Sequence, residues 1–181
     1  MKPVFDQDQK PVFDQDQRYL DAAEAHGGAL QRLARAMEAH PERRRDLLQE
    51  MHVALWRSLA KFDGRCSLKT WVYRVAHNVA ATHVGREARR NRGLVGEEAI
   101  GPVVAADNPA SDYERGDALE RLNAWIRALK PADRQVMTLY LEEMDAPAIA
   151  EIAGFTPGAV TTRISRLKAR LAEDFREKAD V

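Results

Sequence analysis

The chain has 181 residues, of which 45% are hydrophobic and 31% charged, so it is long enough for one domain or two small ones and too short for a large multi-domain enzyme. Its apolar stretches are short, and its first residues lack the apolar core of a secretory signal, so we expect a cytoplasmic protein with no membrane contact of its own. A single cysteine, Cys66, excludes an internal disulfide.

The 28 basic and 28 acidic residues cancel over the whole chain but are unevenly distributed. Residues 18–92 hold 15 basic and 8 acidic residues, whereas residues 93–113 hold four acidic residues and no basic one. Residues 163–170 carry four basic residues and no acidic one. Basic clusters gain free energy by releasing counterions from phosphates, so the pattern indicates a polyanionic partner. A solvated, arginine-rich helix surface explains it equally well.

The N-terminus contains a perfect duplication. The octapeptide KPVFDQDQ occupies residues 2–9 and recurs without change at residues 10–17. Two copies with so short a period do not make a solenoid, and the sequence is rich in Asp and Gln. We predict that residues 1–17 form a duplicated low-complexity tail outside the fold.

Helical periodicity predicts three helices within residues 18–91, which together make a small bundle. The first helix stops at His40-Pro41, because proline disfavours a helical conformation in the residue before it. The second begins near Glu42 and ends close to Phe62, and the third covers about residues 68–87. Trp56, Trp71 and Trp125 lie on apolar ridges and are expected to pack in the interior rather than stack on bases.

Residues 92–113 lose this periodicity and gain Gly, Pro and Asp, which predicts a linker. Helical pattern resumes over residues 114–178, with a break at Lys130-Pro131. No stretch shows the alternation of a half-buried strand. The predicted fold is all-α, with a three- to four-helix bundle and a second four-helix domain joined by a flexible linker.

The segment DAPAIAEIAGFTPGAVTTRISRLKARL at 145–171 predicts a helix-turn-helix. Asp145 can cap its first helix, Gly154 can supply the left-handed residue that ends it, and Thr156 can cap the second helix. The outer face of the second helix is basic, as expected of a helix that enters the major groove of DNA. An ordinary helical hairpin with a solvated outer face is the alternative.

Two segments resemble one protein family. GFTPGAVTTRISRLKARL, preceded by IAEIA, resembles the C-terminal domain of the small extracytoplasmic-function (ECF) sigma factors of the bacterial sigma-70 family. DLLQEMHVALWRSLAKFDGRCSLKTWVYRVAHNVA resembles region 2 of the same family, with its Gln-Glu pair, its Leu-Trp pair and its Phe-Asp turn. The two segments occur in the family's order, on either side of the predicted linker.

The resemblance implies a dissociable subunit of RNA polymerase that directs promoter recognition, with core RNA polymerase, promoter DNA and an anti-sigma factor as partners. The residues implied in binding core polymerase are Asp46, Gln49, Glu50, His52, Val53 and Arg57. The residues implied in binding the minus-10 element as a separated strand are Asp63, Gly64, Arg65, Ser67, Lys69, Arg74, His77 and Asn78. The residues implied in binding the minus-35 duplex are Thr156, Pro157, Gly158, Thr161, Thr162, Arg163, Ser165, Arg166, Lys168 and Arg170.

A stand-alone helix-turn-helix regulator remains an alternative, although the basic first domain argues against it. The sequence contains no phosphate-binding loop, no nucleophile elbow and no catalytic cluster, so an enzyme is not expected. His77 and His83 are six residues apart, which does not place them on one helix face, and we expect neither a metal nor a cofactor. The acidic linker fits either a plain tether or a segment that occupies a cationic channel.

Overall fold

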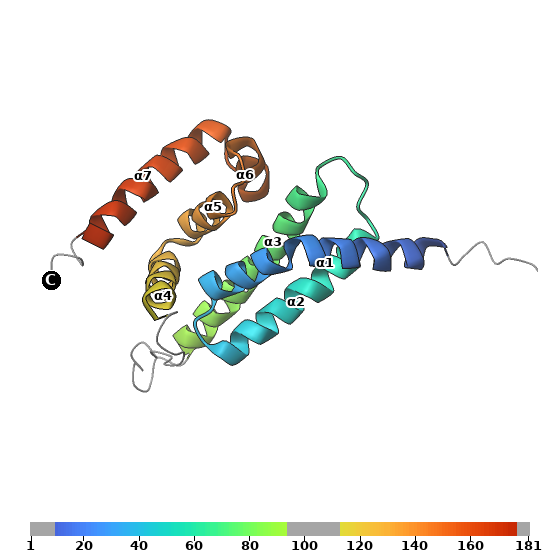
Figure 1. Cartoon of the computed structure of the whole chain (residues 1–181), viewed down its shortest axis with the longest axis horizontal. Coiled ribbons are helices and arrows are strands. Elements are labelled where there is room, and N and C mark those ends of the chain that lie inside the picture. The colour runs from blue at the N-terminus through green and yellow to red at the C-terminus, as the bar shows by residue number, and fades with distance from the viewer. Residues whose placement is uncertain (1–9, 94–112, 177–181) are drawn as a thin grey trace, which may run out of the picture.

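The computed structural model describes residues 10–93 and 113–176, and within these ranges it contains seven α-helices and no β-strand (Figure 1). The helices are α1 (Lys10–Met37), α2 (Pro41–Leu59), α3 (Leu68–Gly93), α4 (Tyr113–Ala128), α5 (Pro131–Leu141), α6 (Ala146–Ala153) and α7 (Pro157–Arg176). Helices α1 to α3 form one group and α4 to α7 a second group beside it. The predicted all-α fold is confirmed. None of these helices is long and apolar enough to cross a membrane.

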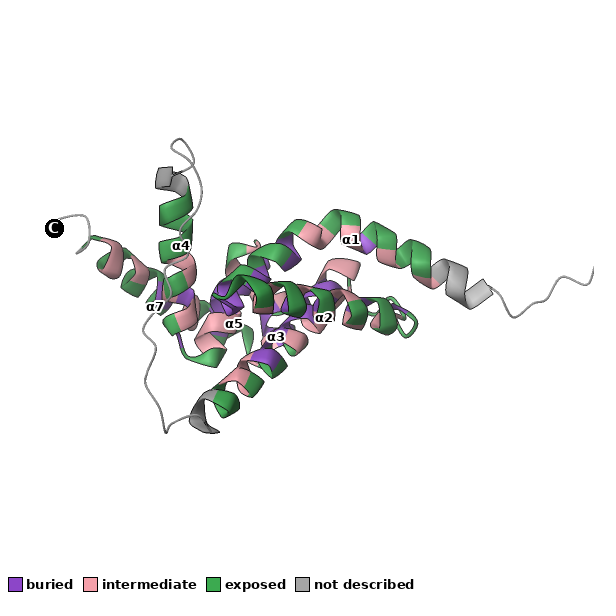
Figure 2. Ribbon diagram, turned by 90° about the horizontal axis from the view of Figure 1, so that it is seen from below, coloured by how far each residue is buried: buried purple, intermediate pink, exposed green. Residues whose placement is uncertain are grey.

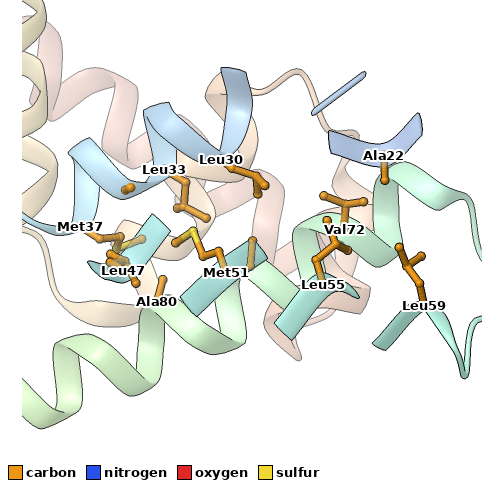
Figure 3. Packing of buried hydrophobic residues seen from close by; sticks show 12 residues of the cluster. Ala22, Leu30, Leu33, Met37, Leu47, Met51, Leu55, Leu59, Val72 and Ala80 are labelled. Carbon is orange, nitrogen blue, oxygen red and sulfur yellow. The ribbon is translucent and has the colours of Figure 1, made fainter. Parts of the chain in front are cut away.

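The first group is held together by a continuous apolar core (Figure 3). In α2 the residues Leu47, Met51, Leu55 and Leu59 follow one another at a spacing of four, so they line one helix face and are all buried. Side chains of α1 and α3, among them Leu30 and Val72, pack against this face. Full burial of each such side chain contributes about 1.5–3 kcal/mol, and this core therefore fixes how the three helices lie.

The second group contains the predicted helix-turn-helix, and its caps are confirmed. The Asp145 carboxylate accepts a hydrogen bond of 2.9 Å from the Ala148 N–H at the start of α6. Gly154 ends α6 with a φ of 73°, a left-handed conformation that glycine adopts without steric strain. The Thr156 hydroxyl accepts a hydrogen bond from the Ala159 N–H at the start of α7. Val160 of α7 is fully buried and packs with residues of α5 and α6.

The prediction that residues 1–17 lie outside the fold is wrong for the second octapeptide. Residues 10–17 form the first turns of α1, and the side chains of Gln15 and Asp16 reach α2. The Gln15 amide donates to the Trp56 carbonyl at 2.7 Å, and the Trp56 indole N–H donates to Asp16 at 2.7 Å. Trp56 is 38% exposed, so the prediction that it packs in the interior is wrong. The first octapeptide lies outside the described residues.

The two helical groups contact each other directly. Ala29 of α1 and Tyr73 of α3 are buried in a cluster that otherwise belongs to the second group. Ala36 of α1 is buried in a cluster with Ile126 of α4 and with Leu129, which follows that helix. Contacts of α3 with α5 and α6 join the two groups, and Figure 2 shows that much of α7 is exposed. The predicted linker lies almost wholly outside the described residues, and its Tyr113 already belongs to α4.

Candidate nucleic-acid and partner surfaces

A groove of about 630 Å³ runs between α2 and α3. Its walls contain five of the six residues implied in polymerase binding, namely Asp46, Gln49, Glu50, Val53 and Arg57. The opposite wall comes from α3 and includes Val79, Thr82 and Arg86, which the sequence reasoning did not assign to this surface. Arg86 donates to the Glu50 carboxylate at 2.5 Å across the groove. Val53 is 41% exposed there, an apolar side chain that a partner could cover.

The sixth residue, His52, does not line this groove. Its Nδ1 lies 3.0 Å from the Tyr19 hydroxyl of α1, and the two rings meet edge to face. Burial against α1 lowers the pKa of His52, because it disfavours the charged imidazolium. His52 therefore holds α1 against α2 in this structure and does not belong to the groove.

The loop between α2 and α3 forms the mouth of a smaller pocket, of about 350 Å³. Asp63 and Gly64 of the implied minus-10 set line it with Phe62, Leu68 and Arg18. Gly64 has a φ of 76°, which turns the chain sharply. Arg65 is outside this lining and holds the loop, because its backbone N–H donates to Asp63 at 3.1 Å and its side chain at 2.5 Å. These hydrogen bonds lower the pKa of Asp63 and keep it ionised. Sequence patterns could not place Arg18 here, since it comes from α1.

The implied minus-10 residues on α3 divide between two sides of the helix. Lys69 and Arg74 make polar contacts with the second helical group, and His77 is only 3% exposed. Burial lowers the pKa of His77 to about 3, although the nearby Glu142 carboxylate opposes this shift. Asn78 instead lines the groove between α2 and α3. The structure therefore does not bring the four side chains onto one surface.

Helix α7 presents its implied minus-35 residues to solvent. Nine of them are exposed, namely Thr156, Pro157, Gly158, Thr161, Thr162, Ser165, Arg166, Lys168 and Arg170. Arg163 is half-buried, and its guanidinium lies 4.5 Å from the centre of the Phe155 ring. Asp133 of α5 accepts hydrogen bonds from Arg163 at 2.6 Å and from Arg166 at 3.0 Å. Sequence patterns missed Asp133, which fixes the direction of both arginines.

Among the described residues, no group of three or more His, Cys, Asp or Glu side chains could hold a metal ion. The two cavities described above are open grooves with mixed walls rather than closed chambers with converging catalytic groups. The chemistry that these surfaces offer is recognition, through hydrogen bonds, charge and apolar contact.

Comparison with known protein families finds a match in each of the two helical groups. A family model described as sigma-70 region 2 matches residues 22–90, and a second, described as sigma-70, region 4, matches residues 119–171. The chain belongs to the sigma-70 family. Region 2 corresponds to residues 22–37 of α1, all of α2 and most of α3, and region 4 to most of α4, all of α5 and α6 and most of α7.

Curated relatives place the chain in the ECF group of this family. RNA polymerase sigma factor CnrH of Cupriavidus metallidurans is 29% identical over 155 residues, which are 81% of each chain. RNA polymerase sigma factor YlaC of Bacillus subtilis is 27% identical over 75% of this chain and 79% of its own. The ECF RNA polymerase sigma-E factor of Haemophilus influenzae is 28% identical over 68% of this chain and 69% of its own.

A solved structure shares the fold. It is the structure of CnrH in complex with the cytosolic domain of CnrY, which matches 95% of this chain and 99% of its own with a TM-score of 0.65 and 21% identity. The match extends over both helical groups.

Proposed function

We propose that this chain is an ECF sigma factor that binds core RNA polymerase through the groove between α2 and α3 and directs transcription initiation at promoters. The observation that carries the proposal is the presence of regions 2 and 4 in one chain. The groove combines the exposed apolar Val53 with the charged Asp46 and Arg57, as protein interfaces do. A regulatory role is supported, and catalysis by the chain is not part of the proposal.

Promoter recognition is assigned to two surfaces. The exposed polar face of α7 fits the major groove of the minus-35 duplex, since a helix can enter that groove and Arg166 can donate to base edges or phosphates. The pocket beneath Asp63 and Gly64, with Arg18 at its wall, fits an unpaired base of the minus-10 strand. Two linked sites raise the effective concentration of each, so the domains bind a promoter better together than apart.

An anti-sigma protein is proposed as a third partner. The structural relative CnrH was solved with the cytosolic domain of CnrY bound to it, and this chain shares its fold. We place the chain in the cytoplasm, where core polymerase and promoter DNA are found.

The stand-alone regulator is the weaker alternative, because a helix-turn-helix alone would not require region 2 and its groove. Binding of purified core polymerase separates the two functions. We expect Gln49→Ala to weaken core binding about tenfold through the loss of interfacial hydrogen bonds. Gln31→Ala is the matched control, since Gln31 is exposed on α1 and does not line the groove. Equal affinities for the two variants would remove the groove from the docking surface.

A further inference from the structure

One carboxylate lies behind the exposed basic face of α7. The Asp133 carboxylate of α5 accepts a hydrogen bond of 2.6 Å from Arg163 Nη1, and both of its oxygens accept from Arg166 Nη2 at 3.0 Å. The Asp133 side chain is only 13% exposed, whereas those of Arg163 and Arg166 are 30% and 62% exposed. Asp133 therefore lies beneath the two arginines rather than beside them at the surface.

The packing of region 4 fixes the position of Asp133. The residue lies in the first turn of α5, where the partial positive charge of a helix N-terminus favours a carboxylate. Val136 of α5 and Val160 of α7 share one buried cluster, and Met137 of α5 and Leu167 of α7 share another. These apolar contacts hold α5 against α7, so the carboxylate meets the two arginines from a rigid support.

The two arginines differ in what else holds them. Arg163 is half-buried, and its guanidinium lies 4.5 Å from the centre of the Phe155 ring, so it has a second partner within region 4. Among the residues that the structure describes, Arg166 hydrogen-bonds to Asp133 alone, and it does so through Nη2. The N–H groups on Nε and Nη1 of Arg166 are therefore available to another acceptor.

An arginine that is already oriented loses less conformational entropy when it binds a base. In the major groove, arginine distinguishes guanine by donating to its O6 and N7 atoms, and a mobile side chain must first be ordered to do so. Asp133 restricts Arg166 before DNA binds. Because Arg163 pairs with the same carboxylate, the charge of Asp133 remains compensated when Arg166 donates to a base.

The same carboxylate opposes the binding of DNA in general. The phosphates of any duplex are attracted to the basic face of α7, and a negative charge 3.0 Å from Arg166 lowers that attraction. A repulsion that acts on all sequences, combined with an oriented contact to one base pair, increases the difference in affinity between sequences.

We propose that Asp133 is a positioning residue for base recognition by region 4. It orients Arg166 toward one base pair, expected to be G·C, and lowers the affinity for all other duplexes, without touching DNA itself. This inference deepens the proposed function and rests on its minus-35 assignment.

Asp133→Asn tests this role, because asparagine keeps the size of the side chain and an acceptor oxygen but has no charge. Asp117→Asn is the matched control, since it removes the same charge from an exposed position of α4 in the same region. Each full-length protein, alone and with core polymerase, selects duplexes from a randomised pool, and sequencing gives the base preference at each position. Gel shifts then compare the selected duplex with a mixed-sequence duplex.

We expect Asp133→Asn to lower the preference for the base pair that Arg166 contacts about fivefold, because Arg166 loses a charge-assisted hydrogen bond that orients it. The affinity for the mixed-sequence duplex should instead rise, about twofold more than with Asp117→Asn. A misfolded region 4 would bind both duplexes less, so these opposite changes distinguish positioning from a loss of structure. In an Arg166→Ala background, Asp133→Asn should no longer change the base preference.

Equal base preferences in Asp133→Asn and Asp117→Asn would overturn the proposal and leave the proposed function intact. A loss of preference that persists in the Arg166→Ala background would show that Asp133 does not act through Arg166, which also overturns it. A chain that does not bind core polymerase, but whose own base preference still depends on Asp133, would contradict the proposed function and support this inference. Absence of any sequence preference in the original protein, alone and with core polymerase, would overturn both.

Discussion

The two surfaces assigned to DNA differ in what the free protein does with them. On α3 the cations Lys69 and Arg74 face the second helical group and are bound there. On α7 the basic face is open to solvent, and Arg166 is only tied to Asp133 within the same group. The charge of a helix face therefore does not by itself show whether DNA can reach that face. Contacts with the second helical group make the cations of α3 less accessible than those of α7.

A substitution in the apolar core that supports α7 should have the largest effect on the difference between the two DNA-binding surfaces. Leu139 is fully buried between the helices of region 4, so Leu139→Ala should lower the free energy of unfolding by about 2–5 kcal/mol. The affinity of α7 for duplex DNA should then fall. The cations of α3 that contact the second helical group should become accessible, so the affinity for single-stranded DNA should rise. Urea denaturation and anisotropy measure the two effects.

Leu141→Ala is the control for that variant, since it makes the same change in the same helix at a side chain that is 43% exposed. We expect it to alter stability by about 0.5 kcal/mol or less. If both variants unfolded at the same urea concentration, the packing described for region 4 would be wrong.

Acid should weaken the fold through His77. Its pKa is about 3 in the folded protein, against an ordinary value of 6.5, so the unfolded chain binds the extra proton first as the pH falls. Stability is therefore lost as the pH drops below 6.5, by about 2 kcal/mol at pH 5. Denaturation curves of His77→Gln should lose less stability over this window. An identical pH dependence in the two proteins would show that His77 titrates normally.

The ends of the helices could largely be predicted from local sequence, but the contact between the two helical groups could not. Pro41, Pro131 and Gly154 mark helix ends through backbone geometry that depends only on neighbouring residues. Arg32 and Glu142, which form an ion pair between the groups, are 110 positions apart, and no local pattern encodes such a pairing.

Helix geometry alone indicates that the implied minus-10 residues of α3 do not share one helix face. Lys69 and Asn78 were assigned to the same surface, but nine residues at about 3.6 per turn place them about half a turn apart. The structure accordingly puts Asn78 in the groove with α2. The second octapeptide was misjudged for a different reason, because its polar composition does not reveal that Asp16 meets the Trp56 indole.

Arg166→Ala should affect only the exposed basic face of α7. We expect the variant to lose about 1–3 kcal/mol of affinity for a minus-35 duplex, with unchanged binding to core polymerase, since Arg166 lies outside the groove. Gel shifts on duplex DNA and a core-binding assay measure the pair of quantities. Loss of both to the same degree would contradict the separation of the two surfaces.

Tyr73→Phe should have the smallest effect of these substitutions, and it should act on the contact between α3 and the second helical group. The variant keeps the buried ring and removes only the hydroxyl that donates to Glu142, so this contact should weaken by about 1 kcal/mol. Energy transfer between dyes on Arg45→Cys of α2 and Ala169→Cys of α7, both exposed positions, in a Cys66→Ser background detects this change. If Tyr73→Phe opened the chain as much as Glu142→Gln does, ring packing rather than the carboxylate would hold the groups together.

Run-off transcription with purified bacterial core polymerase and genomic DNA fragments tests the central claim most directly. The account predicts new, specific transcripts when this protein is added, and their reduction when Gln49→Ala replaces it. A protein that shifts duplex DNA by itself, yet neither binds core polymerase nor changes the transcript starts, would contradict the assignment and favour a stand-alone regulator.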